Sequence, residues 1–325
     1  MKEAILQMLK SGTDFISGQD LCEYFKVSRT AVWKVINQLK EEGYEIEAVN
    51  RKGYRLVSSP DILSESEILS GLSTEVLGKK IYRYDCIGST NDQARMLAEN
   101  GAPDGSLVIA ETQDRGKGRR GRGFFAPPGS GIWMSLILKP EIPPVEASMI
   151  TLLGAMAVLD MLESYGLSGG IKWPNDLVAD KKKITGILTE MSAGPDQINY
   201  IVLGIGINVN MKDFPEELRA NAISMAMISG KTYHRAEVIQ RVMKSLEKYY
   251  RMFLDSGNLA FMKEKYNERL VHMNKEISVH EIRRVWKGVS RGINDIGELI
   301  VSTDAGDTIV RSGEVSIRGV YGYAE

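Results

Sequence analysis

The sequence contains few of the residues that build disulfide frameworks and metal centres. It has two cysteines, Cys22 and Cys86, and three histidines, His234, His272 and His280, among 325 residues. Two cysteines can form neither a disulfide framework nor a thiolate zinc site. No two histidines have the His-x-x-x-His spacing, which excludes the zinc-protease motif.

An excess of charge of one sign and long apolar runs are also missing. The 41 Lys and Arg residues and the 42 Asp and Glu residues leave a net charge of −1, so no global field attracts nucleic acid or an anionic membrane. No segment resembles an apolar span of about 20 residues, and residues 1–17 lack the apolar core of a signal peptide. We expect a soluble cytoplasmic protein that contacts no membrane, with two or three domains at about 100–200 residues each.

Residues 1–60 are predicted to form a winged helix-turn-helix domain. Ser17 and Ser28 are placed to cap two helices, and Gly43 ends the second of these, where a C-terminal glycine is expected. Two extended runs follow at residues 44–49 and 53–57, joined by a hairpin turn. In this order of elements, the helix that begins after Ser28 is the one that enters the DNA major groove.

The candidate DNA contacts lie on this helix and on the hairpin: Ser28, Arg29, Thr30, Lys34, Asn37, Arg51 and Lys52. The charge of the domain is weakly supportive, because residues 1–60 hold nine Lys and Arg against eight Asp and Glu. A protein-interaction module is the alternative. We interpret Trp33 as a packing residue rather than a reader of bases.

Residues 66–272 alternate between strand and helix patterns after a short linker at Ser58-Ser59-Pro60. Strands are expected at residues 80–85, 106–112, 131–138, 186–191 and 200–209. Residues 149–162 are apolar nearly all round, which favours a buried helix, and residues 235–253 form an amphipathic helix. Residues 273–325 have short β-like runs and turns, which predict a small barrel of about 50 residues.

A cationic, glycine-rich segment lies at residues 114–122, Asp-Arg-Gly-Lys-Gly-Arg-Arg-Gly-Arg. Gly116, Gly118 and Gly121 have the Gly-x-Gly-x-x-Gly spacing, but Phe-Phe-Ala-Pro-Pro-Gly follows and cannot start the helix that a dinucleotide site needs. Five cations against Asp114 give a net charge of +4 on a backbone that glycine lets approach a ligand closely. We interpret the segment as a loop that binds a substrate with several anionic groups; the alternative is a solvated basic loop.

Two further segments present polar side chains at turns. In Lys172-Trp-Pro-Asn-Asp176, Asn175 and Asp176 either orient a substrate or hold Mg²⁺ through water, or they only shape the turn. In Lys181-Lys-Lys183, the lysines are typical of a solvated hairpin turn. Lys183 begins the next strand, which allows it to point inward.

Two glycines and a helix start complete the candidate site. Leu203-Gly-Ile-Gly-Ile-Asn208 is an apolar strand whose glycines leave room for a flat ligand, with Asn208 as a polar contact. Ser89-Thr-Asn91 lies at a strand–helix junction and by itself is typical of a helix N-cap.

Together these segments resemble one family, the bifunctional biotin–protein ligases that are also repressors of the biotin operon. The resemblance extends over essentially the whole chain, from Ser-Arg-Thr-Ala-Val-Trp at residues 28–33 to Gly-Glu-Val-Ser-Ile-Arg at residues 313–318. It implies an α+β multidomain fold: a winged helix-turn-helix at residues 1–60, a catalytic domain at residues 66–272 with a central mixed sheet like that of class II tRNA synthetases, and a Src-homology-3-like β-barrel at residues 273–325.

The resemblance also implies roles for individual residues. The biotin-binding residues would be Ser89, Thr90, Asn91, Gln113, Lys117, Gly118, Arg119 and Lys183. The residues that bind ATP and the adenylate would be Arg119, Arg120, Arg122, Phe124 and Asn208. The catalytic residues would be Lys183, Arg119 and Asp176. Two positions depart from the family pattern: Lys117 stands where arginine is usual, and Phe124 stands where tryptophan is common.

The implied reaction activates biotin with ATP as biotinyl-5′-AMP and transfers it to a lysine of a carboxylase biotin carrier domain. The cofactors would be ATP and Mg²⁺, with Mg²⁺ arriving with the nucleotide and no metal cage formed by the protein. The adenylate would act as corepressor, and the adenylate-bound protein would bind operator DNA as a homodimer. The alternatives are a lipoate or octanoate ligase of the same fold group and a biotin-sensing repressor without catalysis.

Overall fold

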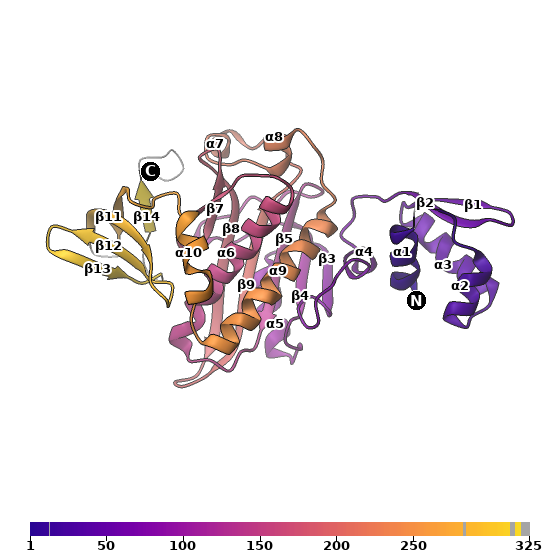
Figure 1. The fold of residues 1–325 in the computed structure, drawn as a ribbon, viewed down its shortest axis with the longest axis horizontal. Coiled ribbons are helices and arrows are strands. Elements are labelled where there is room, and N and C mark those ends of the chain that lie inside the picture. The colour runs from indigo at the N-terminus through magenta and orange to yellow at the C-terminus, as the bar shows by residue number, and fades with distance from the viewer. Residues whose placement is uncertain (13, 282–283, 313–315, 320–325) are drawn as a thin grey trace. The chain divides into compact units, whose positions relative to one another are not determined.

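The computed structural model describes residues 1–12, 14–281, 284–312 and 316–319. The chain divides into two compact units. One is formed by Met1–Ser73 with His234–Gln240, and the other by Thr74–Tyr233 with Arg241–Glu325. Figure 1 shows the elements of both units.

The first unit is a helix-turn-helix with a hairpin. Its elements are α1 (Lys2–Ser11), α2 (Gly18–Phe25), α3 (Arg29–Glu41), β1 (Glu45–Val49), β2 (Gly53–Ser58), α4 (Glu65–Leu69) and the first residues of α9 (Arg235–Ser256). Both predicted caps are present, because the hydroxyls of Ser17 and Ser28 accept hydrogen bonds from the N–H groups of Gln19 and Ala31. Gly43 follows α3 with a φ of +97°, a conformation that glycine adopts without strain. The predicted order of elements is confirmed.

One residue of this unit lies where the sequence analysis did not place it. Trp33 is 55% exposed, so the prediction that it packs in the core was wrong. The core-facing stripe of α3 is already filled by residues spaced three and four apart: Val32, Val35, Ile36 and Leu39. Position 33 falls outside this stripe because successive helical residues are rotated by about 100°.

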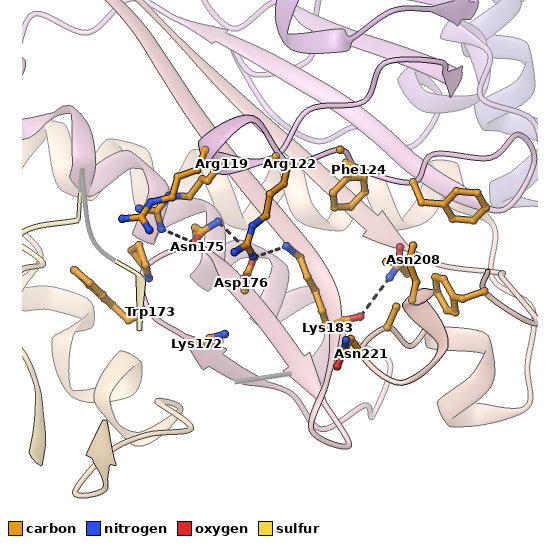
Figure 2. Close-up of a pocket in the computed structure, with 18 residues that line it drawn as sticks. Arg119, Arg122, Phe124, Lys172, Trp173, Asn175, Asp176, Lys183, Asn208 and Asn221 are labelled. Atoms are coloured by element: carbon orange, nitrogen blue, oxygen red, sulfur yellow. Dashed lines mark hydrogen bonds and ion pairs between the residues drawn. The ribbon is translucent and has the colours of Figure 1, made fainter. Parts of the chain in front are cut away.

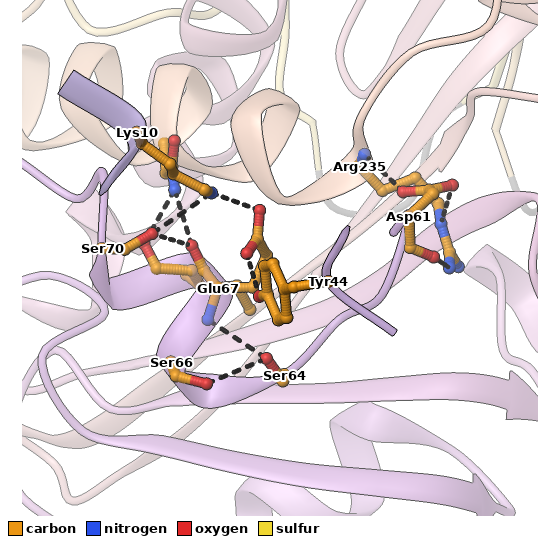
Figure 3. Close-up of polar contacts among 10 residues, drawn as sticks. Lys10, Tyr44, Asp61, Ser64, Ser66, Glu67, Ser70 and Arg235 are labelled. Atoms are coloured by element: carbon orange, nitrogen blue, oxygen red, sulfur yellow. Dashed lines mark hydrogen bonds and ion pairs between the residues drawn. The ribbon is translucent and has the colours of Figure 1, made fainter. Parts of the chain in front are cut away.

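Figure 3 shows the polar contacts that connect the linker region to the start of α9 within this unit. The buried Glu67 on α4 accepts a hydrogen bond from the Tyr44 hydroxyl and forms an ion pair with Lys10. Burial, together with the adjacent Glu67 carboxylate, raises the pKa of Tyr44. Arg235, only 1% exposed, donates from Nε to Asp61 over 3.0 Å. These contacts order residues 61–67 without an apolar core of their own.

The second unit is built on a seven-stranded mixed sheet with the order β3-β4-β5-β9-β8-β7-β6. Its strands are β3 (Ile81–Ile87), β4 (Leu107–Gln113), β5 (Gly131–Leu138), β6 (Gly170–Lys172), β7 (Asp176–Ala179), β8 (Lys182–Ala193) and β9 (Ile198–Asn208). Only the β3–β4 pair is parallel among these strands. The predicted strands and the mixed central sheet are confirmed; the short β6 and β7 were not predicted.

The helices and turns of this unit are α5 (Thr90–Glu99), η1 (Arg119–Gly121), η2 (Pro144–Glu146), α6 (Ala147–Ser164), α7 (Glu216–Arg219), α8 (Met225–Ser229), the remainder of α9, and α10 (Ala260–Glu268). Helix α6 packs on β8 and β9. A Cβ on its Gly154 would meet Ile187 and Leu203 at 3.4 Å, which indicates how closely the helix approaches the sheet.

Helix α6 is also the one described helix long and apolar enough to cross a membrane. The segment Pro144–Ser164 passes by length and composition, so the expectation that no such apolar span exists was wrong. However, 78% of its apolar window is buried inside the structure. It is the core helix that its all-round apolar pattern predicted.

The C-terminal part of the chain forms a separate antiparallel sheet with the order β13-β12-β11-β10-β14. Its strands are β10 (Glu276–His280), β11 (Val285–Ile293), β12 (Leu299–Thr303), β13 (Gly306–Val310) and β14 (Ser316–Gly319). This is the small C-terminal β domain that was predicted. Residues 313–315 of the motif at residues 313–318 lie outside the described residues.

Candidate functional site

Two adjoining cavities lie where four segments of the second unit converge. The segments are the start of α5, the loop between β4 and β5, the β6–β7 turn and the adjacent ends of β8 and β9. The larger cavity measures about 350 Å³ and the smaller about 40 Å³. Both are lined by Gly118, Arg119, Phe124, Asn175 and Lys183. A molecule that occupied both cavities would therefore pass these five residues.

The smaller cavity is lined by the residues predicted to bind biotin. Its lining includes Ser89, Thr90, Asn91, Gln113, Lys117, Gly118, Arg119 and Lys183. Ser89 is the N-terminal flanking residue of α5, as predicted, but its side chain makes no capping hydrogen bond and is buried. The side chain of Ser89 is therefore placed for the cavity rather than for the helix.

A hydrogen-bond network connects the buried polar side chains of this smaller cavity. Gln113 Oε1 accepts from the backbone N–H of Thr90 over 2.6 Å and from its hydroxyl over 3.1 Å. The Ser135 hydroxyl contacts Thr90 Oγ1 at 2.8 Å and Asn91 Oδ1 at 2.6 Å, and Asn91 Nδ2 donates to Glu190 over 2.8 Å. A ligand with urea-like donors and acceptors finds paired partners here, but it must widen a 40 Å³ space to enter.

The larger cavity is strongly cationic (Figure 2). Five cations line it, Arg119, Arg120, Arg122, Lys172 and Lys183, against the single carboxylate of Asp176. The remaining lining includes Phe124, Phe214 and Leu218. A net charge of +4 beside apolar and aromatic walls is suited to a polyphosphate that carries a flat ring.

Lys183 lies at the centre of the site, as Figure 2 shows. Its ammonium forms an ion pair with Asp176 at 2.6 Å, and its side chain is 23% exposed. The turn before it has left-handed residues at Asp180 and Lys181, so the predicted hairpin turn is confirmed. Lys183 itself is turned inward, as one of the two open interpretations required.

Asn175 connects this pair to the glycine-rich loop. Its Oδ1 accepts from Arg119 over 3.0 Å, and its Nδ2 donates to the carbonyl oxygen of Ile187 over 2.9 Å. Arg119 also donates to the carbonyl oxygen of Ser312 over 2.8 Å. The Lys-Trp-Pro-Asn-Asp segment therefore both shapes a turn and presents polar groups to the larger cavity.

The glycine-rich loop is folded back on itself over the two cavities. The N–H of Gly118 donates to Arg122 over 2.7 Å, and that of Phe124 to Gly116 over 2.8 Å. Lys117 forms an ion pair with Asp92 at 2.5 Å. No α-helix begins between residues 122 and 146, so the exclusion of a dinucleotide-binding turn is confirmed.

The two glycines of β9 serve a different purpose from the one predicted. A Cβ on Gly204 would lie 2.1 Å from Asn91 Oδ1, and one on Gly206 would lie 2.7 Å from the Phe124 ring. The room that these glycines leave is therefore occupied by the protein's own side chains. Asn208 is buried and donates to the carbonyl oxygen of Ile223 over 3.1 Å.

Sequence reasoning missed three side chains that support the site. Ser135 and Glu190 belong to the network of the smaller cavity; the signal for Ser135 was a lone hydroxyl in the apolar strand β5. His272 is buried, with Nε2 accepting from the Trp173 N–H at 3.3 Å and Nδ1 2.9 Å from Ser290 Oγ. Burial, with the charges of Lys172 and Lys275, lowers the pKa of His272 to about 4.

The candidate DNA contacts lie together on the first unit. Arg29, Thr30 and Lys34 are exposed on α3, and Asn37 is half-buried. Arg51 and Lys52 lie at the exposed tip of the β1–β2 hairpin. Ser28 is exposed and is engaged as the α3 cap.

Comparisons with known proteins agree with this geometry. A family model described as "HTH domain" matches residues 2–55, and one described as "Biotin/lipoate A/B protein ligase family" matches residues 83–208. The chain is 42% identical to "Bifunctional ligase/repressor BirA" of Bacillus spizizenii and 41% identical to that of Bacillus subtilis, over 97% of this chain and 98% of each relative. It is also similar to the solved biotin protein ligase from Aquifex aeolicus in complex with biotin and ATP, with 26% identity and a TM-score of 0.65 over 74% of this chain and all of that one.

Proposed function

We propose, from the membership of this chain in the family of bifunctional biotin ligase/repressor proteins, that it activates biotin with ATP and also represses transcription. The observation that carries the ligase activity is the pair of adjoining cavities with Lys183 and Arg119 on their shared wall. Biotin would occupy the smaller, hydrogen-bonding cavity, and ATP the larger, cationic one. Their reacting groups would meet at Lys183.

In the first step, a carboxylate oxygen of biotin attacks the α-phosphorus of ATP and pyrophosphate leaves. The obstacle is the approach of two anions. Lys183 and Arg119 offset this repulsion, because cations fixed at the point where charge accumulates stabilise the transition state. The site supplies no nucleophile because the substrate carboxylate is itself the nucleophile.

In the second step, the deprotonated ε-amine of a carrier-domain lysine attacks the carbonyl carbon of the mixed anhydride. An amide bond forms and AMP leaves. The loop at residues 114–124 covers both cavities, so it would retain the reactive adenylate and exclude water until the carrier arrives.

Mg²⁺ would accompany ATP rather than occupy a protein cage. Asp176 is the carboxylate on the wall of the larger cavity, and among the described residues no three His, Cys, Asp or Glu side chains gather as a metal site. Asp176 is therefore the residue that would contact a phosphate-bound Mg²⁺ through water. The ion would supply neutralisation of phosphate charge.

The repressor activity is assigned to the first unit. Its helix-turn-helix would place α3 in the major groove of operator DNA. Two copies in an adenylate-dependent homodimer would read two half-sites, since a closed dimer is matched by a palindromic site. The protein would act in the cytoplasm, where biotin, ATP, carrier domains and DNA are all present.

The test of the ligase activity is ATP-dependent transfer of labelled biotin to a carrier domain, run in parallel with lipoate and octanoate. Transfer of biotin alone is expected. Transfer of lipoate or octanoate in place of biotin would identify a ligase of the other substrate class. Binding of biotin with no adenylate formed would leave a biotin-sensing repressor without catalysis.

A further inference from the structure

The face of α3 that points away from the core of the first unit carries one large apolar side chain. Thr30, Trp33, Lys34 and Asn37 follow the spacing i, i+3, i+4, i+7, which places them on one side of the helix. Three of them are polar and short or charged. Trp33 is 55% exposed, whereas Trp133 and Trp173 are each 1% exposed and Trp286 is half-buried.

Trp33 lies near the N-terminal end of α3, five residues after the cap at Ser28. In a helix-turn-helix, the N-terminal part of the second helix is the part that contacts base edges. If this helix enters the groove with its exposed face, it must therefore carry the indole with it. An indole cannot bind phosphate as an ion, and its single N–H is its only polar group.

We propose that Trp33 reads sequence by apolar contact with a thymine methyl group on the floor of the major groove. The thymine C5-methyl is the apolar group that base pairs present there. Neighbouring Thr30 and Asn37 supply hydrogen-bonding groups to flanking base edges, and Lys34 supplies charge for phosphate. This inference rests on the repressor activity proposed above and specifies how α3 discriminates among sequences.

The experiment uses the full-length protein with biotin and ATP, and a duplex that the wild-type protein selects from a randomised library. Each thymine of a half-site is replaced singly by uracil, which removes only the methyl group. For the wild type, one position is expected to lose affinity several-fold. Trp33→Ala is expected to bind the unmodified duplex roughly 10- to 100-fold more weakly, the range of one lost base contact, and to be insensitive to uracil at that position.

Tyr24→Ala is the matched control, because Tyr24 is a 70% exposed aromatic on α2 of the same unit. It should keep the uracil response of the wild type. Trp33→Phe keeps an apolar ring and should retain part of that response, and unchanged thermal unfolding of both Trp33 variants establishes that they fold.

Two results would overturn the inference alone. One is a uracil response of Trp33→Ala equal to that of the wild type; the other is an operator affinity unchanged by Trp33→Ala, including the case in which only self-association changes. Selection of no specific duplex by the wild type would overturn the repressor activity and this inference together.

Discussion

Lys183 and Asp176 form an ion pair at 2.6 Å on the wall of the larger cavity. The pair keeps the ammonium in the site before any ligand arrives, so little reorganisation is needed when a phosphate takes the place of the carboxylate. Preorganised charge of this kind acts on the transition state more than on the bound substrate.

We therefore expect Lys183→Ala to slow pyrophosphate release about 10²–10³-fold, since one such contact is worth roughly 2–4 kcal/mol in the transition state. The affinity for biotin should change far less. Lys182→Ala is the control, because the Lys182 ammonium donates to the Arg219 carbonyl oxygen at the surface. Equal rates for wild type and Lys183→Ala would return Lys183 to the role of a turn residue.

His272 links stability to pH. Its pKa is lowered from 6.5 to about 4 in the folded protein by burial and by Lys172 and Lys275. Between these values the unfolded state binds more protons than the folded state, so the free energy of unfolding falls as the pH decreases from about 6.5 to about 4. At ~1.4 kcal/mol per pKa unit, the loss from this group amounts to roughly 3 kcal/mol.

Urea unfolding between pH 4.5 and pH 7, at pH values set by the His272 window, measures this loss. His272→Gln, which cannot gain a proton, should give a flatter pH dependence than the wild type. His234→Gln, at an exposed position, should leave the pH dependence unchanged. Parallel curves for the wild type and His272→Gln would contradict the assignment.

At the scale of elements, strand β9 determines the shape of the smaller cavity through its glycines. Gly204 faces the Asn91 side chain so closely that a methyl group would lie 2.1 Å from Asn91 Oδ1. Asn91 would have to leave the position in which it bonds to Ser135 and Glu190. A backbone position on one element therefore sets a side-chain position on another.

Gly204→Ala is expected to weaken biotin binding about 10-fold, the equivalent of one displaced hydrogen bond at ~1–1.5 kcal/mol, while ATP binding is retained. Isothermal titration calorimetry measures both affinities. The matched control is Gly194→Ala in the β8–β9 hairpin, where the nearest atom would be 3.8 Å away. Biotin affinity equal to that of the control would exclude this role of β9.

At the scale of the whole molecule, the proposed activities are connected by the adenylate. It accumulates when unmodified carrier is scarce, so its occupancy of the enzyme reports demand for biotin. The first unit has a net charge near zero, and phosphate neutralisation supplies most non-specific affinity for DNA. A single copy should bind DNA weakly, and dimerisation should dominate the affinity.

We expect operator binding to tighten with biotin plus ATP and to loosen when unmodified carrier is added. Lys52→Ala should lower the salt dependence of operator binding, a slope of roughly 0.9 per lost phosphate contact in each half-site, without changing biotin transfer. Filter binding or fluorescence anisotropy at several salt concentrations measures both effects. Operator affinity that is the same with and without the adenylate would refute the corepressor role.

The sequence by itself determined the elements and the chemical character of the site. Ser17, Ser28 and Gly43 mark helix ends through bonds to residues one to four positions away, and the alternation of apolar residues marks the strands of the central sheet. The charge of the loop at residues 114–122 is likewise a property of composition. Each of these signals is local, and a local signal can be read without knowledge of the fold.

Only the tertiary structure decided which polar side chains meet. Asn91 bonds to Ser135, 44 positions away, and to Glu190, 99 positions away, because the order and register of the sheet bring β5 and β8 beside the start of α5. The exposure of Trp33 and the contacts of His272 with Trp173 and Ser290 depend on the same kind of long-range placement. Helical and strand periods assign a residue to a face of its own element, but the packing of the other elements decides what that face contacts.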